Sequence, residues 1–346
     1  MRRRTKRLPS SRGLIYLVLV VLLMGARYIY NNYMTPTDRQ GATTLAHLAS
    51  EVSKTESSTS GAENSGDNSV ASTTAPRKKA KRTGWAELPA EVVDNDLYYA
   101  YHTISEEGSH DTRRNYTTCF SRELRCPVWV AAPMHRSYTG DIQRTDSYQP
   151  DPKLPTNIQP LLSRSYGGAY SRGHLLGSAE RTSSREANIQ TFYVSNIAPQ
   201  LREGFNAWGG AWNNLEAFAD KQVCADTLYV VTGCLFTEYE DTDGTIIKPT
   251  THSNRNDSQR VGVPTAYYKA LLRTRSGRSG KSVRECKAQE LKCAAFIVGH
   301  RSAQGRKPSA QEMISIEELE RLTGFEFFTN VKNAPKNEAN ARDWGL

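Results

Sequence analysis

The sequence contains no apolar run long enough for a typical membrane span. Its longest run, residues 14–25, holds 12 residues, whereas a spanning helix needs about 20. Six basic residues and no acidic residue precede this run, which is typical of a secretory signal, while Arg27 and the tyrosines behind it favour a signal anchor whose arginine reaches the membrane interface. We expect a basic cytoplasmic flank over 1–13, a signal anchor or signal peptide over 14–33, and export of the rest, leaving the chain anchored in the cell envelope or secreted. A buried core helix is the least favoured interpretation.

Cysteine spacings typical of metal sites are also missing. No Cys-x-x-Cys pair occurs, and no cysteine pairs with a histidine at zinc spacing, which argues against a structural zinc site. The cysteines are even in number and form three close pairs, as expected for an exported protein with disulfide bonds. A turn-like tetrapeptide separates the first pair, so a disulfide across a hairpin is our first expectation and buried free thiols are the alternative. The three pairs are Cys119 and Cys126, Cys224 and Cys234, and Cys286 and Cys293.

Apolar residues are scarce in the first quarter of the chain. Residues 35–84 have no aromatic side chain and are rich in Ser, Thr, Ala, Gly and Asn, so they cannot bury enough surface to offset their conformational entropy. We predict a disordered linker over 34–84 and a folded domain over 85–346. The net charge is +9, but residues 1–94 hold 14 Lys and Arg against 8 Asp and Glu. The basic composition is therefore weak support for nucleic-acid binding by the folded part, where a local patch would have to attract phosphate.

The chain lacks the regular alternation of strands and helices that marks a doubly wound parallel sheet. Helical spacing predicts a helix over 212–223 and a capped helix over 315–322. Together with the strands below, this pattern predicts an α+β domain with a largely antiparallel sheet. Apolar and β-branched runs predict strands over 116–119, 127–131, 191–195, 227–232, 267–274 and 294–298.

In contrast to these missing features, residues 171–216 contain several side chains that could bind a metal ion, a proton or a phosphate. His174 follows a glycine, and a neutral imidazole is well suited to take a proton from water near pH 7. Asn206 could hold a hard metal ion, Glu216 lies nearby in sequence, and Arg172 could meet an anionic phosphate. A single histidine or asparagine is more often structural, but this combination matches what a metal-dependent phosphodiesterase needs, because water must be deprotonated and a leaving oxygen neutralised.

The same segment resembles the signature of the DNA/RNA non-specific endonucleases. This resemblance implies a ββα-metal (His-Me finger) nuclease fold, with a largely antiparallel central sheet flanked by helices. Similar blocks flank the segment, so that the likeness covers roughly residues 96–330. The matching segments are Ser-Arg-Gly-His at 171–174, Ser-Asn-Ile-Ala-Pro-Gln at 195–200, Phe-Asn at 205–206 and Trp-Asn-Asn-Leu-Glu at 212–216, with flanking blocks at 114–119, 144–152, 229–233 and 316–324.

The resemblance implies separate catalytic and metal-binding roles for three residues. His174 would be the general base that activates the attacking water. Asn206 would be the direct protein ligand of Mg²⁺, with Mn²⁺ or Ca²⁺ as substitutes, and waters would complete the coordination. Glu216 would hold one of those waters and belongs to the expected catalytic residues.

It also implies how substrate is bound. Arg172 and Arg144 would bind the phosphate and stabilise its charge as the reaction proceeds, and Asn196 would support the substrate site. The expected partners are DNA and RNA, because recognition through phosphate ignores base sequence, and the products would be a 5′-phosphate and a 3′-hydroxyl. Members of the family are often dimers, so a homodimer is also expected.

The spacing between two of these residues departs from the family pattern. Asn206 and Glu216 are ten residues apart, where the family usually has eight. We expect the two extra residues to bulge within 207–210, ahead of the helix, because that segment contains two glycines. If they lay inside the helix, Glu216 would rotate away from Asn206 and the rival ligands would be Asn213 and Asn214.

A second departure keeps another function open. Ser171 stands where the family usually has Asp, so a carboxylate near the histidine is missing. The alternative function is a catalytically impaired nuclease-like domain that binds nucleic acid or a protein partner, and a phosphodiesterase for small nucleotides is a weaker one. His135 and His252 are expected to be exposed structural residues, and 255–260 to be a solvated loop.

Overall fold

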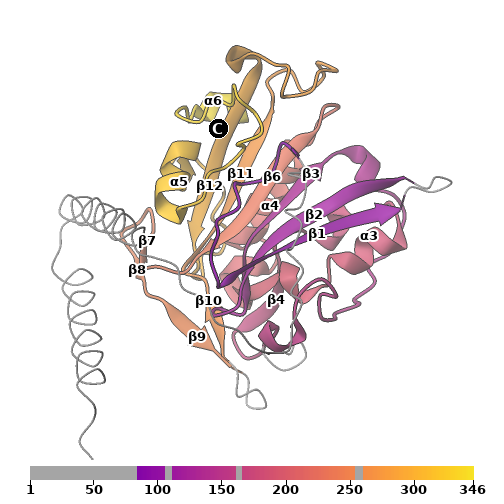
Figure 1. Ribbon diagram of the computed structural model, residues 1–346. Coiled ribbons are helices and arrows are strands. Elements are labelled where there is room, and N and C mark those ends of the chain that lie inside the picture. Colours follow the sequence, from indigo (N-terminus) through magenta and orange to yellow (C-terminus); the bar gives the residue numbers. More distant parts are fainter. Residues whose placement is uncertain (1–83, 106–110, 161–165, 254–259) are drawn as a thin grey trace, which may run out of the picture. The chain divides into compact units, whose positions relative to one another are not determined.

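A seven-stranded antiparallel sheet runs through the domain in the order β1-β2-β3-β6-β11-β12-β13 (Figure 1). The computed structural model describes residues 84–105, 111–160, 166–253 and 260–346, which all belong to one compact unit, residues 79–346. The elements are β1 (Leu97–Ser105), β2 (Thr112–Ser121), β3 (Cys126–Met134), β4 (Tyr170–His174), α3 (Arg185–Gln190), β5 (Ile197–Leu201), α4 (Ala211–Asp220), β6 (Leu228–Leu235), β7 (Tyr239–Glu240), β8 (Ile246–Ile247), β9 (Thr250–His252), β10 (Val261–Val263), β11 (Ala266–Thr274), β12 (Leu291–Gly299), β13 (Met313–Ile314), α5 (Ile316–Thr323) and α6 (Ala341–Trp344).

The expected N-terminal flank and signal segment lie outside the described residues, as does the linker except for its last residue. Within the described ranges, no helix combines the length and the apolar character needed to cross a membrane.

The central sheet is buried on both faces because its strands alternate between two cores. Tyr268 of β11 points to a core that includes Leu319 of α5. Its neighbour Tyr267 points to the opposite core, where its ring lies 5.2 Å from that of Trp212 in α4. Burial on both sides explains why β11 and β12 read as nearly continuous apolar runs rather than as alternating ones. Helices α4 and α5 therefore cover opposite faces of the sheet.

Five of the six predicted strands are confirmed as β2, β3, β6, β11 and β12, and the predicted helices are confirmed as α4 and α5. Ser315 caps α5 by accepting a hydrogen bond from the Glu318 backbone at 3.1 Å, and Gly324 ends it in the left-handed conformation at φ 74°. The α+β class with a largely antiparallel sheet is correct.

The predicted strand over 191–195 is wrong. The backbone N–H of Phe192 bonds to Ile189 O at 3.0 Å and that of Tyr193 to Gln190 O at 3.2 Å. A single turn of 3₁₀ helix follows at Val194–Asn196. Beyond these local hydrogen bonds the segment forms only one isolated β-bridge, between Tyr193 and Gln149. Its β-branched and aromatic composition is therefore overridden by its setting after α3.

The expected disulfide across the first hairpin is also wrong, since all six cysteines are free. Cys119 of β2 packs in the core beneath α5, while Cys126 of β3 packs in the core beneath α4. A bulge between Cys119 and Phe120 shifts the pairing register, and the two thiols end on opposite faces of the sheet. The alternative of buried free thiols holds for this pair.

A separate two-stranded ribbon carries the candidate chemistry. β4 and β5 pair antiparallel, with His174 opposite Ile197, and β5 leads through an irregular turn at Arg202–Asn206 into α4. β5 also contacts β10, and in Figure 1 the label of β4 lies below those of the long strands β1 and β2. The result is a strand-strand-helix unit, with His174 at the end of its first strand and Asn206 in the turn before its helix.

Candidate active site

Gly173 allows the two strands of the ribbon to lie against each other with a glutamine between them. The Gln200 side chain covers Gly173 so closely that a Cβ atom there would lie 2.1 Å from Gln200 Cδ. Any other residue would have to displace Gln200, which is fully buried. The glycine before the histidine therefore has a packing reason that the sequence alone did not reveal.

His174 ends β4 with its ring among aromatic side chains. The ring centroid lies 4.9 Å from that of Phe192 and 5.8 Å from that of Tyr148. Burial lowers the pKa of His174 to about 3, and the positive charges of Arg144 and Arg172 add to this effect. The imidazole is therefore neutral at neutral pH, as a general base must be before it acts.

The proton of the neutral ring can be assigned from its contacts. Nε2 of His174 is buried and has no hydrogen-bond partner among the residues that the structure describes, whereas a hydrogen bond with the Arg172 backbone raises the pKa of the ring. That bond must involve Nδ1, which donates its proton. The lone pair on Nε2 is then free to accept a proton from water.

Two arginines share the aromatic surroundings of His174. The guanidinium of Arg172 lies 3.9 Å above the ring of Tyr148, and that of Arg144 lies 4.8 Å above the ring of Phe192. Arg144 also donates to the Tyr148 hydroxyl at 3.1 Å. The structure thus brings together three of the residues predicted from sequence and adds two aromatic side chains that were not predicted as site residues.

Arg144 is further oriented by two polar neighbours, donating to Asp146 at 2.8 Å and to the Ser178 hydroxyl at 3.0 Å. About half of its side chain is exposed, and Arg172 is exposed as well. Both cations can therefore meet a phosphate that approaches His174 from solvent.

Asn206 reaches back to the start of β4. Its Nδ2 donates to the Ser171 hydroxyl at 2.8 Å, and that hydroxyl donates its own proton to the Gln200 carbonyl at 3.0 Å. Because a carbonyl can only accept, Ser171 must accept from Asn206, which forces the amide nitrogen toward Ser171 and the oxygen away from it. Within the described part of the chain, Oδ1 of Asn206 makes no hydrogen bond and remains able to bind a hard cation.

Asn196 is fully buried, and its amide is fully used. Its Oδ1 accepts from the Leu176 backbone at 2.9 Å, while Nδ2 donates to Leu176 O at 2.9 Å and to Thr191 O at 2.7 Å. With its amide bonded to the backbone of Leu176 and Thr191, Asn196 does not itself reach toward substrate. Instead, Asn196 holds the chain two residues after His174 and acts as a positioning residue.

Glu216 lies on α4 among other charged groups. Its electrostatic neighbours are Lys269, Glu180 and Asp220, and burial raises the pKa of its carboxyl to about 8. Lys269 is buried beneath α4, 5.1 Å from the ring of Trp212. Despite the nearby Lys269, the raised pKa favours the protonated carboxyl of Glu216 at neutral pH, and a bound Mg²⁺ would favour its charged form.

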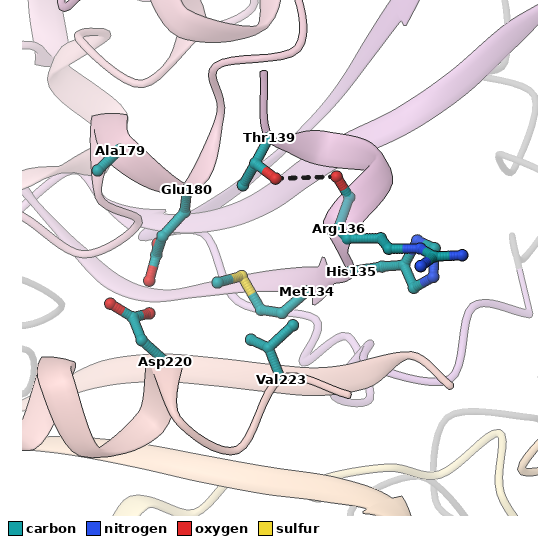
Figure 2. Close-up of a pocket in the computed structure, with 8 residues that line it drawn as sticks. All are labelled: Met134, His135, Arg136, Thr139, Ala179, Glu180, Asp220 and Val223. Atoms are coloured by element: carbon teal, nitrogen blue, oxygen red, sulfur yellow. Dashed lines mark hydrogen bonds between the residues drawn. The ribbon is translucent and has the colours of Figure 1, made fainter. Parts of the chain in front are cut away.

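Two of these neighbours also line a cavity of about 300 Å³. In Figure 2 the carboxyl groups of Glu180 and Asp220 point toward each other. Desolvation of the Asp220 carboxyl and the nearby charge of Glu180 both raise the pKa of Asp220. The other lining residues are Met134, His135, Arg136, Thr139, Ala179 and Val223.

The two extra residues between Asn206 and Glu216 lie ahead of α4, as expected, because the helix begins at Ala211. The side chains of Asn213 and Asn214, the alternative metal ligands, are instead used in hydrogen bonds to the backbone. Asn213 Oδ1 accepts from the Gly209 backbone at 3.0 Å, and Asn214 Nδ2 donates to Gly209 O at 3.0 Å and to Arg306 O at 2.7 Å. Both amides therefore close the loop that precedes the helix.

The other histidines singled out from sequence also have structural contacts. His135 Nδ1 accepts from the Ser137 backbone at 3.1 Å and caps a short turn. The ring of His252 packs 4.9 Å from that of Tyr170. Of the segment 255–260, only Arg260 is described, and its guanidinium donates to the backbone oxygen of Thr251 at 2.7 Å.

The ribbon, the helix that follows it and the histidine at the end of the first strand define a ββα-metal nuclease fold. A chain from the crystal structure of the EndoG/EndoGI complex has a similar fold, with a TM-score of 0.50 and 24% sequence identity over 67% of this chain and 87% of that chain. This likeness supports the α+β class and the expected nuclease fold.

The chain belongs to the DNA/RNA non-specific endonuclease family, a family of metal-dependent endonucleases whose sequence profile matches residues 95–334. It is 28% identical to the mitochondrial nuclease EXOG of Mus musculus, over 64% of this chain and 58% of that protein. It is 26% identical to the mitochondrial endonuclease G of Homo sapiens, over 64% of this chain and 69% of that protein. The match thus spans less than three fifths of mouse EXOG.

Proposed function

We propose that this protein is a metal-dependent endonuclease that hydrolyses phosphodiester bonds of DNA and RNA. The observation that carries the proposal is the unpartnered Nε2 of His174 beside two arginines, on a ββα unit of this family. A buried polar atom without a partner is costly, and its retention here is explained if a water molecule uses it during the reaction.

In this mechanism, Nε2 of His174 takes a proton from the attacking water. Arg172 and Arg144 bind the phosphate and stabilise the charge that builds up on its oxygens. Their positive charges lower the pKa of His174 in the free protein, so an anionic phosphate that offsets them makes the imidazole a stronger base once substrate is bound. Cleavage leaves a 5′-phosphate and a 3′-hydroxyl.

The residues around Asn206 suit Mg²⁺. Its free Oδ1 is a hard oxygen donor with an orientation fixed by Ser171, and Mg²⁺ binds through few protein oxygens because it retains most of its waters. Among the described residues no three His, Cys, Asp or Glu side chains are placed to hold a metal together, so Asn206 would act with water, and Glu216 would hold one such water. The ion would supply positive charge that neutralises the leaving oxygen, and Mn²⁺ or Ca²⁺ would fit the same donors.

The test is cleavage of plasmid DNA and of RNA by the full-length chain, with Mg²⁺ or with EDTA. Wild type should cut both substrates in Mg²⁺ and neither in EDTA, while His174→Ala should be slower by about 100-fold or more. His135→Ala is the matched control because that half-buried histidine caps a turn and is not among the proposed catalytic residues, and it should cut normally. Intact substrates in Mg²⁺ would rule out the proposal, and binding without cutting would favour the impaired nuclease-like domain. Equal rates for wild type and His174→Ala would instead reject the assigned base.

We also propose that the N-terminal segment directs export and anchors the chain in a membrane. The support is the basic flank before the apolar run 14–25 and the position of Arg27. Intact-mass measurement of the membrane and secreted fractions tests this, since retention of the first 26 residues supports the anchor. We also propose a homodimer, because members of the family are often dimers. Analytical ultracentrifugation tests this by measuring the mass of the protein in solution.

A further inference from the structure

Trp208 is the one tryptophan of the five that is almost wholly exposed, at 91%. Trp129, Trp212 and Trp344 are buried, and Trp85 is half-buried. A scattered exposed apolar residue is normal on a protein surface, so exposure alone does not indicate a site. An exposed indole on a rigid support two residues after the metal ligand is a more specific observation.

The loop that carries Trp208 is held in place through hydrogen bonds to its own backbone atoms, and the indole of Trp208 makes none of them. The Gly210 N–H bonds to Ala207 O at 2.8 Å, and the Gln304 amide donates to Trp208 O at 3.2 Å. Gly209 O accepts from the Gly305 N–H at 2.8 Å. Gly209 itself has φ 77°, a conformation that glycine adopts without strain. The loop is therefore preorganised, and the indole takes no part in organising it.

The same loop contains the two residues by which this chain exceeds the family spacing between Asn206 and Glu216. Two residues of chain span at most about 7 Å, so the backbone of Trp208 lies within about one nucleotide of the expected metal position. Arg202, at the start of the turn before Asn206, and Arg172, on β4, are both exposed and belong to the same strand-strand-helix unit as Trp208. An exposed aromatic face and exposed guanidinium groups on one unit are the combination of groups that binds single-stranded nucleic acid.

We propose that Trp208 stacks on an unpaired nucleobase next to the phosphate that is cleaved, and so gives this nuclease a preference for single-stranded substrates. The proposal rests on the nuclease function proposed above. A base in a duplex already stacks on its neighbours and must be unpaired before it can reach the indole, whereas an unpaired base can stack at once. Every base offers an aromatic face, so the preference would concern strandedness and not sequence.

The composition of the loop favours a nucleobase over a protein or lipid partner. The residues around Trp208 are Ala207, Gly209, Gly210 and the polar Gln304. They add little apolar surface, whereas a protein hot spot or a membrane-binding loop needs several large apolar side chains together.

The test follows tryptophan fluorescence of the full-length chain in EDTA, where no cleavage occurs, during titration with a 12-nucleotide oligo(dT) or with the same strand paired to oligo(dA). The single strand should quench wild type, and Trp208→Ala should remove the quenching and weaken binding about tenfold or more. Trp208→Phe should restore most of the affinity because phenylalanine retains an aromatic face. Leu322→Ala is the control, since Leu322 is 46% exposed on α5, across the sheet from the site.

The same variants in Mg²⁺ should show a raised KM on single strands for Trp208→Ala, with little change in kcat or in cleavage of duplex. Quenching without cleavage by wild type would refute the nuclease function and leave the stacking site standing. Cleavage by wild type without Trp208-dependent quenching would overturn the stacking site alone. Equal effects of Trp208→Ala on single strand and duplex would overturn the preference, and quenching by anionic lipid vesicles but not by oligo(dT) would identify a membrane contact instead.

Discussion

Ser171 shows how one hydroxyl group can decide the orientation of the proposed metal ligand Asn206. Its proton is committed to the Gln200 carbonyl, so its lone pair accepts from Asn206 and the amide oxygen is turned outward. An aspartate, which the family usually has here, could also accept from Asn206 but would add a negative charge near the phosphate. The serine therefore preserves the orientation without that charge.

We predict that Ser171→Ala lets the Asn206 amide rotate and raises the Mg²⁺ concentration needed for half-maximal cleavage by about 10- to 100-fold, as is usual when the partner of a metal ligand is lost. Ser171→Thr keeps the hydroxyl and should stay close to wild type. The measurement is cleavage rate against Mg²⁺ concentration. An unchanged Mg²⁺ dependence in Ser171→Ala would show that Asn206 is oriented by something else.

At the scale of elements, His300 fastens the end of β5 to the loop before β11. Its Nε2 accepts from the Leu201 backbone at 2.8 Å, and its Nδ1 must donate to Pro264 O at 2.8 Å. A neutral ring satisfies both bonds, while a protonated ring would face the Leu201 N–H with a second N–H. The ribbon that carries His174 is thus tied to the central sheet by a histidine that must stay neutral.

Burial lowers the pKa of His300 to about 4, below the ordinary value of 6.5. The unfolded chain then binds a proton at higher pH than the folded chain, so the stability from His300 is complete above pH 6.5 and declines as the pH falls toward 4. The loss should reach at most about 3 kcal/mol. Urea unfolding at pH 7.5 and pH 4.5 measures it. His300→Gln, which retains a donor and an acceptor but does not titrate, should lose less stability than wild type over this range, and an equal loss would refute the assignment.

The whole molecule is organised by a sheet that separates two cores, and the cysteines follow this division. Cys119, Cys286 and Cys293 pack beneath α5, whereas Cys126 and Cys234 pack beneath α4. Cys224 is half-buried. Burial raises the pKa of Cys293 to about 12 and raises that of the other buried thiols as well, so these groups react slowly while the protein is folded.

We predict that the purified protein has six free thiols, as counted with a thiol reagent in guanidinium chloride. In the native protein, Cys224 should react first because it is the least buried. A reducing agent should leave the melting temperature unchanged, since no cross-link restrains the unfolded chain. Fewer than six thiols without reductant, together with a fall in melting temperature on reduction, would contradict the arrangement described.

Sequence alone predicted the elements whose signals are local. The caps of α5 lie within one turn of its ends, and the apolar run of β11 reflects burial on both faces. The order of short motifs likewise selected His174, Arg172 and Asn206 as candidates, and the fold places all three on one strand-strand-helix unit. Strand composition failed over 191–195, where hydrogen bonds to the preceding helical turn outweighed β-propensity.

Tertiary structure decided which partners each of these residues meets. Asn196 is turned inward to Leu176 and Thr191, and Glu216 lies near Lys269, to which no short motif points. Two cysteines seven residues apart end on opposite faces of the sheet, and Trp208 is left exposed on a loop held by Gln304. The amino-acid sequence thus determined which reactive side chains are present and which local helices and strands form. Burial, charge and hydrogen-bond partners depend on segments brought together only by the fold, so only the fold decided what each side chain can do.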